Sequence, residues 1–109
     1  MAKFRALGKR TPKIILCLDE YVAMTAAHGY FMVTGKPQVV LVHVDIGTMQ
    51  IGGALHNAQR SRIGVILCAG RSPSTIAGNE KQTGRTNYVM WWQEQYDQAG
   101  IVRNFVKWD

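Results

Sequence analysis

Short apolar runs alternate with longer segments of helical periodicity along this chain. Three β-branched runs are predicted as strands, at residues 13–18 (KIILCL), 37–44 (PQVVLVHV) and 63–69 (IGVILCA). They are almost continuously apolar, which is typical of strands buried on both faces of a parallel sheet. Helices are predicted at residues 19–34, 48–60 and 88–98. The alternating order predicts an α/β fold, a parallel sheet flanked by helices.

The remaining segments complete a single small domain. Residues 70–86 are polar and rich in Gly, Ser and Thr, so they are predicted to form a long loop. Residues 102–108 are a candidate fourth strand. A narrow parallel sheet leaves edges that need cover. We therefore expect residues 1–109 to form one incomplete, truncated domain that associates with itself or with another chain.

The amino-acid composition and the distribution of charge bear on whether the chain binds nucleic acid. The chain is 47% hydrophobic and 18% charged, which fits a folded protein, and its formal net charge is +6. Five of the basic residues crowd the N-terminus: Lys3, Arg5, Lys9, Arg10 and Lys13. No aromatic-basic interleaving or helix-turn-helix spacing accompanies them, so a solvated basic surface is favoured over a nucleic-acid partner. Contact of some of this charge with a phosphate or with another part of a larger protein stays open.

Cysteine and histidine spacing argues against a metal site. Cys17 and Cys68 lie inside apolar runs without a CxxC pattern, and His28, His43 and His56 share no metal-like spacing. Free buried cysteines favour a reduced protein. No signal-peptide core or membrane-length apolar stretch is visible, so we expect a cytoplasmic protein with no membrane partner.

Three segments are candidates for chemistry because each follows a predicted strand. They are Asp19–Glu20, residues 45–48 and residues 70–72. Ligands of open α/β sheets bind at the carboxyl ends of the strands, so these segments are expected to share one edge. Asp19 suits a helix N-cap and Glu20 the positive end of the helix dipole. A carboxylate that hydrogen-bonds a ligand nitrogen is the alternative for Glu20.

Glycines in the second of these segments permit two interpretations. Gly47 with Gly52 and Gly53 matches no phosphate-binding motif. These glycines allow either a tight turn with close helix packing or close approach to a ligand.

Read in order, several motifs resemble a known family. They are AAHGYFMVTGKP, VHVDIGT, ALHNA, AGRSPST and the tail WWQEQYDQAGIVR, and the similarity runs from about residue 11 to the end. Together they resemble the N-terminal, pyrimidine-binding domain of acetolactate synthase-like thiamine-diphosphate-dependent enzymes. The chain departs from that pattern at Asp19, where close relatives often carry His, and at Gln50, where the Gly-Thr-x-Asn turn usually has Asn.

The resemblance implies a site and a cofactor. Glu20 corresponds to the glutamate that hydrogen-bonds the aminopyrimidine ring of thiamine diphosphate and activates the cofactor. Gly47, Thr48 and Gln50 correspond to residues of the cofactor-binding turn. The family uses such sites to decarboxylate or ligate 2-oxo acids.

The resemblance also implies that other protein parts are needed. In the family the diphosphate and its Mg²⁺ are held by a separate domain, whose GDG motif does not occur in this sequence. Expected partners are therefore a second copy of the chain or a chain that carries the diphosphate domain, and activity of this chain alone is not expected. The alternative is a non-catalytic α/β binding or regulatory module, or an inactive relic, derived from the same domain.

Overall fold

The first long helix follows the sequence prediction. The computed structural model describes residues 2–71 and 95–109, and helix α2 spans Glu20–Thr34. Asp19 is its N-cap, with Oδ1 accepting the Val22 N–H at 2.7 Å. Gly35 ends it in the left-handed conformation, at φ 67°. The predicted helix is confirmed at both ends.

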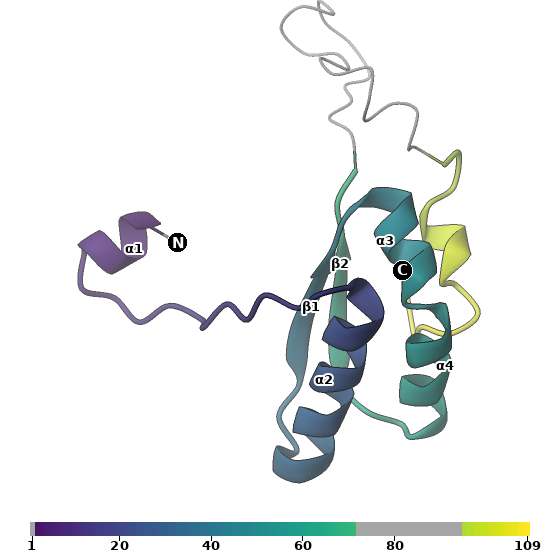
Figure 1. The fold of residues 1–109 in the computed structure, drawn as a ribbon, viewed down its shortest axis with the longest axis horizontal. Helices are drawn as coiled ribbons and strands as arrows, with labels where there is room; N and C mark the ends of the chain where they lie inside the picture. Colours follow the sequence, from purple (N-terminus) through teal and green to yellow (C-terminus); the bar gives the residue numbers. More distant parts are fainter. Residues whose placement is uncertain (1, 72–94) are drawn as a thin grey trace, which may run out of the picture.

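A parallel sheet lies behind this helix (Figure 1). Strands β1 (Gln38–Val42) and β2 (Val65–Ala69) pair in parallel, with Val40 opposite Leu67. Helices α3 (Val44–Gln50) and α4 (Gly52–Arg60) connect them. The predicted α/β class, a parallel sheet with flanking helices, is confirmed.

The hydrophobic core fills the space between the helices and one face of the sheet. Met24 of α2 is fully buried and lies in one cluster with Val40 and Val42 of β1 and with Ile51 and Leu55. The neighbouring side chains Val39 and Leu41 point to the other face and are exposed. Both α2 and α4 therefore cover the same face of the sheet.

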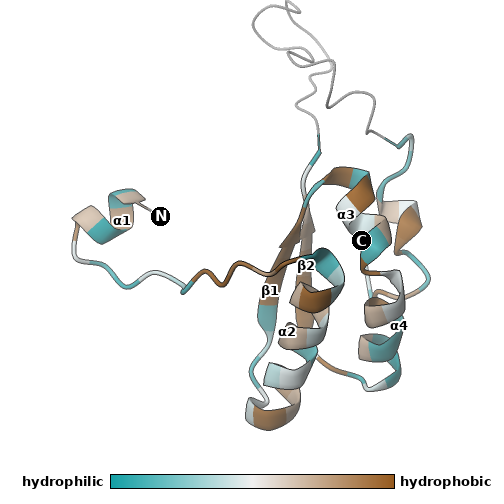
Figure 2. Cartoon of the chain, in the orientation of Figure 1, coloured by the Kyte–Doolittle hydropathy of each residue, from teal (hydrophilic) through white to brown (hydrophobic). Residues whose placement is uncertain are grey.

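That one-sided burial corrects a sequence prediction. Strands buried on both faces were expected, but the outer face carries exposed Val39, Leu41, Ile66 and Cys68. The expectation was wrong for a simple reason. A continuous apolar sequence indicates that both faces of a strand can be buried, but other parts of the protein decide which face is covered. Figure 2 shows the apolar character of both strands.

The crossover helix differs from the prediction in its start and in its continuity. A single helix over residues 48–60 was expected, whereas helix begins at Val44 and is divided at Ile51, which ends α3 and precedes α4. Two glycines at the start of α4 have low helix propensity, which accounts for a break at this point.

Residues 13–18 do not form the predicted strand. They run as an extended segment from α1 (Ala2–Ala6) to α2, and they leave the body of the domain sideways (Figure 1). Leu16 is 96% exposed and Leu18 fully exposed. A β-strand forms only when its backbone hydrogen-bonds to a neighbouring strand. The apolar pattern predicts an extended segment, but it does not specify which strand would pair with it.

The C-terminal segment also corrects a prediction. Residues 102–108 form turns after the short 3₁₀ helix η1 (Ala99–Ile101), not a fourth strand. Val102, Phe105 and Val106 face the core. Their spacing of three and four residues suits a turn-rich segment rather than an alternating strand.

The loop and helix predicted between β2 and η1 lie mostly outside the described residues. Only Gly70 and Arg71 of the expected loop are described, and Gln95–Gln98 of the expected helix 88–98 form an irregular turn. Within the described ranges, no helix is long and apolar enough to cross a membrane.

Candidate functional site

Three segments that are distant in sequence meet at the carboxyl ends of the two strands. Gly70 follows β2, and its N–H donates to the Val42 carbonyl at the end of β1 at 3.1 Å. Glu20, the first residue of α2, lies against Gly47 of α3. The prediction that the three candidate segments share one edge of the sheet is confirmed for their described residues, and Ser72 lies outside these.

At this edge, the Glu20 side chain packs closely against the backbone of Gly47. A Cβ atom added to Gly47 would lie 2.9 Å from Glu20 Oε1 and 3.2 Å from Glu20 Cγ. The Val42 Cβ would be 3.1 Å away on the other side. The Glu20 side chain thus lies over a backbone position that only glycine leaves open, so the interpretation that glycine permits close packing is supported at Gly47. Close approach of Gly47 to a ligand stays a prediction. Glu20 remains half-buried at the positive end of α2.

Gly47→Ala is expected to displace the Glu20 carboxylate. The new methyl group must move a flexible carboxylate and press on Val42, and overpacking of this kind costs about 1–3 kcal/mol. Helix propensity favours alanine at any helical glycine, so the matched control is Gly29→Ala in α2, where an added Cβ meets no atom within 4 Å. Chemical denaturation is expected to show Gly47→Ala less stable than Gly29→Ala by about 1–3 kcal/mol. Equal stabilities would contradict the contact.

Val44 shows backbone strain between β1 and α3. Its φ is 41°, a conformation that β-branched residues rarely adopt. The Thr48 hydroxyl donates to the Val44 carbonyl at 2.6 Å, and Thr48 is only 1% exposed. Strain of this kind persists where surrounding contacts enforce it, and it is concentrated at functional sites. Here it turns the chain so that Gly47 lies under Glu20.

Asp45 is a buried carboxylate in the candidate segment 45–48, where the sequence assigned it no role of its own. It is 3% exposed, and its Oδ1 accepts the Ile46 N–H at 3.0 Å. Its Oδ2 accepts from Gln95 Nε2 at 3.1 Å. A buried carboxylate needs such donors because an unpaired one is costly. Asp45 therefore fixes the start of α3 to the C-terminal segment.

Gln98 joins the ends of the two strands. Its Nε2 donates to the Gly70 carbonyl at 2.9 Å and to Thr48 Oγ1 at 3.3 Å. An amide nitrogen carries two hydrogens, so both bonds can form together. The sequence reasoning missed this role as well. The signal was the DQ pair in the tail motif, whose second residue is Gln98.

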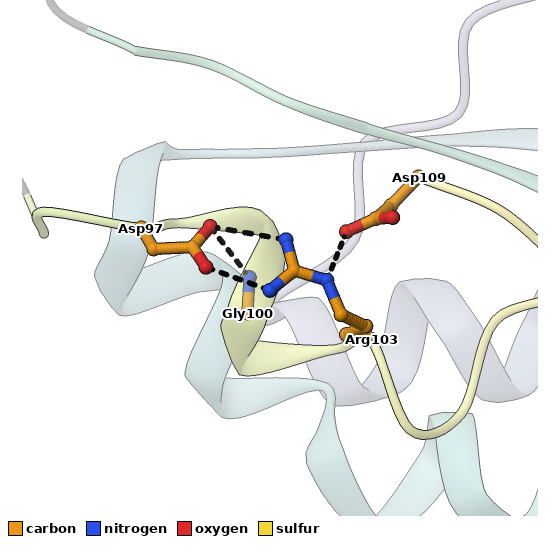
Figure 3. Close-up of polar contacts among 4 residues, drawn as sticks. All are labelled: Asp97, Gly100, Arg103 and Asp109. Carbon is orange, nitrogen blue, oxygen red and sulfur yellow. Dashed lines mark hydrogen bonds and ion pairs between the residues drawn. The ribbon is translucent and has the colours of Figure 1, made fainter.

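An ion-pair cluster holds the turn that presents Gln98 (Figure 3). Arg103 binds Asp97 through both terminal nitrogens, at 2.7 and 3.3 Å, and its Nε donates to Asp109 at 2.8 Å. The Gly100 N–H donates to Asp97 Oδ1 at 3.0 Å. Bidentate pairing restricts both side chains, so the turn has a defined geometry although the groups are exposed.

Acid is expected to loosen this turn. Hydrogen bonding from Arg103, and then from the Gly100 N–H, lowers the pKa of the Asp97 carboxyl below its ordinary value. A lowered carboxyl pKa in the folded state stabilises the turn above the unfolded pKa, near 4, and this contribution is lost as pH falls through the folded value. An NMR pH titration should show the Gly100 amide shifting at that acidic transition. Asp97→Asn should remove the transition, and its persistence in that variant would contradict the assignment.

The remaining candidate site residues take no part in the Glu20–Gly47 contact. Gln50 is exposed at the end of α3. Asp19 is occupied by its capping bond to Val22. Among residues 2–71 and 95–109, no group of three or more His, Cys, Asp or Glu could hold a metal ion.

Thr48 also lines a cavity. Its volume is about 440 Å³, and the described residues that line it include Leu67 and Ala69 of β2, Gln98 and Trp108. Glu20 and Gly47 are not among those residues.

Comparison with known proteins identifies the family of this chain. The family described as thiamine pyrophosphate enzyme, N-terminal TPP binding domain, matches residues 1–101. A Mycobacterium tuberculosis H37Rv protein named "Putative acetolactate synthase large subunit IlvX" is 39% identical over 56 residues, which cover 51% of this chain and 11% of that protein. No solved structure matches the chain. On the family match, the chain belongs to the N-terminal TPP-binding domains of the thiamine pyrophosphate enzymes.

Proposed function

We propose that this chain binds the aminopyrimidine ring of thiamine diphosphate, as part of an acetolactate synthase-like 2-oxo acid decarboxylase or carboligase. The observation that supports the proposal is the Glu20 carboxylate lying over Gly47 at the carboxyl edge of a parallel sheet. Ligands of open α/β sheets bind at this edge. The half-buried Glu20 carboxyl group can donate its proton to a ring nitrogen, or accept from that nitrogen once the nitrogen is protonated, so the residues present fit the cofactor.

Each residue of the edge has a separate part in this proposal. Glu20 hydrogen-bonds the ring nitrogen, and Gly47 leaves room for the Glu20 side chain. The Thr48 hydroxyl already donates to Val44 and accepts from Gln98, so Thr48 holds the turn in place. Gln50 is exposed and available to a ligand.

The chemistry depends on a proton at Glu20. When bound, thiamine diphosphate supplies the electron sink for the decarboxylation or ligation of 2-oxo acids. Glu20 contributes by holding and exchanging a proton at its carboxylate, which is general acid–base catalysis. An aspartate would be about a methylene too short for the same contact, and a glutamine cannot exchange the proton.

The proposal includes a partner for the charged end of the cofactor. A separate diphosphate-binding domain, in another chain or another part of a longer protein, holds the diphosphate and Mg²⁺. The matched segment covers only 11% of the acetolactate synthase-like relative. We place the complex, a homo-oligomer or a mixed one, in the cytoplasm, where the free thiols of Cys17 and Cys68 stay reduced.

Calorimetric titration of thiamine diphosphate with Mg²⁺ tests the proposal. The ligand is titrated into this chain, into a separately expressed diphosphate domain of a related enzyme, and into their mixture. The proposal predicts the tightest binding in the mixture, because the two halves of the cofactor then bind together. Binding in the mixture no tighter than to the diphosphate domain alone would replace the proposal with the non-catalytic module.

A further inference from the structure

Helix α3, which carries Gly47, is short and strained. It has seven residues, and isolated helices of that length are marginal in water. His43, its N-cap, makes no side-chain capping bond in the described structure, and Val44 at its start has a φ of 41°. The position of Gly47 under the Glu20 carboxylate therefore depends on contacts from outside the helix.

Residues 95–98, which precede η1, bind α3 through a matched pair of hydrogen bonds. Gln95 Nε2 donates to Asp45 Oδ2 at 3.1 Å, and Gln98 Nε2 donates to Thr48 Oγ1 at 3.3 Å. Asp45 and Thr48 are buried, at 3% and 1% exposure. The donors have the same spacing along the chain as the acceptors, so this turn holds the first turn of α3 at two points.

Of the two glutamines, Gln98 has the further contacts at the site edge. Its amide also donates to the Gly70 carbonyl after β2, at 2.9 Å. Thr48 in turn donates to the carbonyl of strained Val44 at 2.6 Å. Gln98 is half-buried whereas Gln95 is exposed, so water replaces the bonds of Gln98 less readily. Gln98 therefore connects the end of β2 with the turn that carries Gly47.

We propose that Gln98 is a positioning residue for Glu20: by holding Thr48, it keeps Gly47 under the Glu20 carboxylate before any cofactor binds. Gln98 itself does not touch the cofactor, and it acts through Thr48 and Gly47. The inference deepens the proposed function and rests on it for its meaning in catalysis. A site that is already ordered loses less entropy when its ligand binds, so its affinity is higher.

Hydrogen exchange in the isotopically labelled chain, without cofactor, tests the positioning role. Gln98→Met keeps the length of the side chain and removes its donor. The Gly47 amide donates to the His43 carbonyl at 2.8 Å, and its protection is expected to fall about tenfold when α3 opens more often. The carbon resonance of the Glu20 carboxyl group should shift in the same variant. Gln98→Glu, which has no donor at neutral pH, should give the same loss and serves if Gln98→Met does not fold.

The matched control is Gln59→Met. Gln59 lies on α4, and its Nε2 also donates to a backbone carbonyl of the C-terminal segment, that of Asn104, at 2.9 Å. A general loss of stability would appear in both variants, whereas Gln59→Met should leave Gly47 protection and the Glu20 carbon resonance at wild-type values. Unchanged Gly47 protection in Gln98→Met, an equal loss in the two variants, or an unmoved Glu20 resonance overturns the inference.

Cofactor titration separates this inference from the proposed function. In the mixture with a diphosphate domain, Gln98→Met should weaken thiamine diphosphate binding about tenfold, and Gln59→Met should leave it unchanged. A wild type that does not bind would overturn the proposed function, while the exchange and carbon measurements still decide whether Gln98 positions Glu20. A wild type that binds, with full affinity retained in Gln98→Met, would overturn the positioning role alone.

Discussion

Glu20→Gln is expected to lower turnover of a 2-oxo acid about 10²–10⁴-fold in the complex reconstituted with a diphosphate domain, the usual contribution of a positioned acid or base. Glutamine has nearly the same shape, so it keeps the contact over Gly47 but cannot exchange the proton. Steady-state kinetics should therefore show the loss in kcat, while calorimetry shows cofactor affinity changed far less.

The neighbouring carboxylate provides the control for this substitution. Asp19→Asn removes one negative charge one residue away, and asparagine caps a helix as well as aspartate does. Turnover of Asp19→Asn should stay close to that of the wild type. Equal losses in the two variants would mean that local charge, not a proton at Glu20, supports activity, and undiminished turnover in Glu20→Gln would remove Glu20 from the chemistry.

Met24→Ala is expected to destabilise the domain by about 2–5 kcal/mol, the range for large-to-small changes at buried positions. Met24 is fully buried and lies one helical turn after Glu20, so it anchors the part of α2 that presents the carboxylate. Urea denaturation measures the loss. Folded domains are stable by only about 5–15 kcal/mol, so a change of this size is a large fraction of the total.

Met32→Ala is the matched control on the same helix. Met32 is 65% exposed, and substitutions at exposed positions usually change stability by less than about 0.5 kcal/mol. Similar losses in the two variants would mean that Met24 does not anchor α2 in the core.

Local signals made the helix that carries Glu20 predictable. Asp19 and Gly35 are residues that favour helix caps, and both act as caps in the structure. The shared edge was also predictable, because parallel strands bring their carboxyl ends together. Gly47 was ambiguous in sequence. Only the structure shows that the position is crowded by the Glu20 side chain.

Tertiary contacts account for what the sequence did not reveal. Asp45 belongs to a predicted segment, but its hydrogen-bond donor Gln95 lies fifty residues later in the chain. Gln98 acts through a turn that Asp97 and Arg103 hold, and no short-range pattern encodes such a bridge. The same limit explains residues 14–18: their extended, apolar character was predictable, whereas their lack of a strand partner in the described chain was not.

In the proposed complex, the aminopyrimidine ring binds where Glu20 meets Gly47. NMR spectra of the isotopically labelled chain, in complex with an unlabelled diphosphate domain, can be recorded with and without thiamine diphosphate and Mg²⁺. We predict that the largest shifts occur at the amides of Glu20 and Gly47 and at the Glu20 side-chain carboxyl carbon. Shifts centred on Leu67, Gln98 and Trp108, with Glu20 and Gly47 unchanged, would contradict the account and place the ligand in the cavity beside β2.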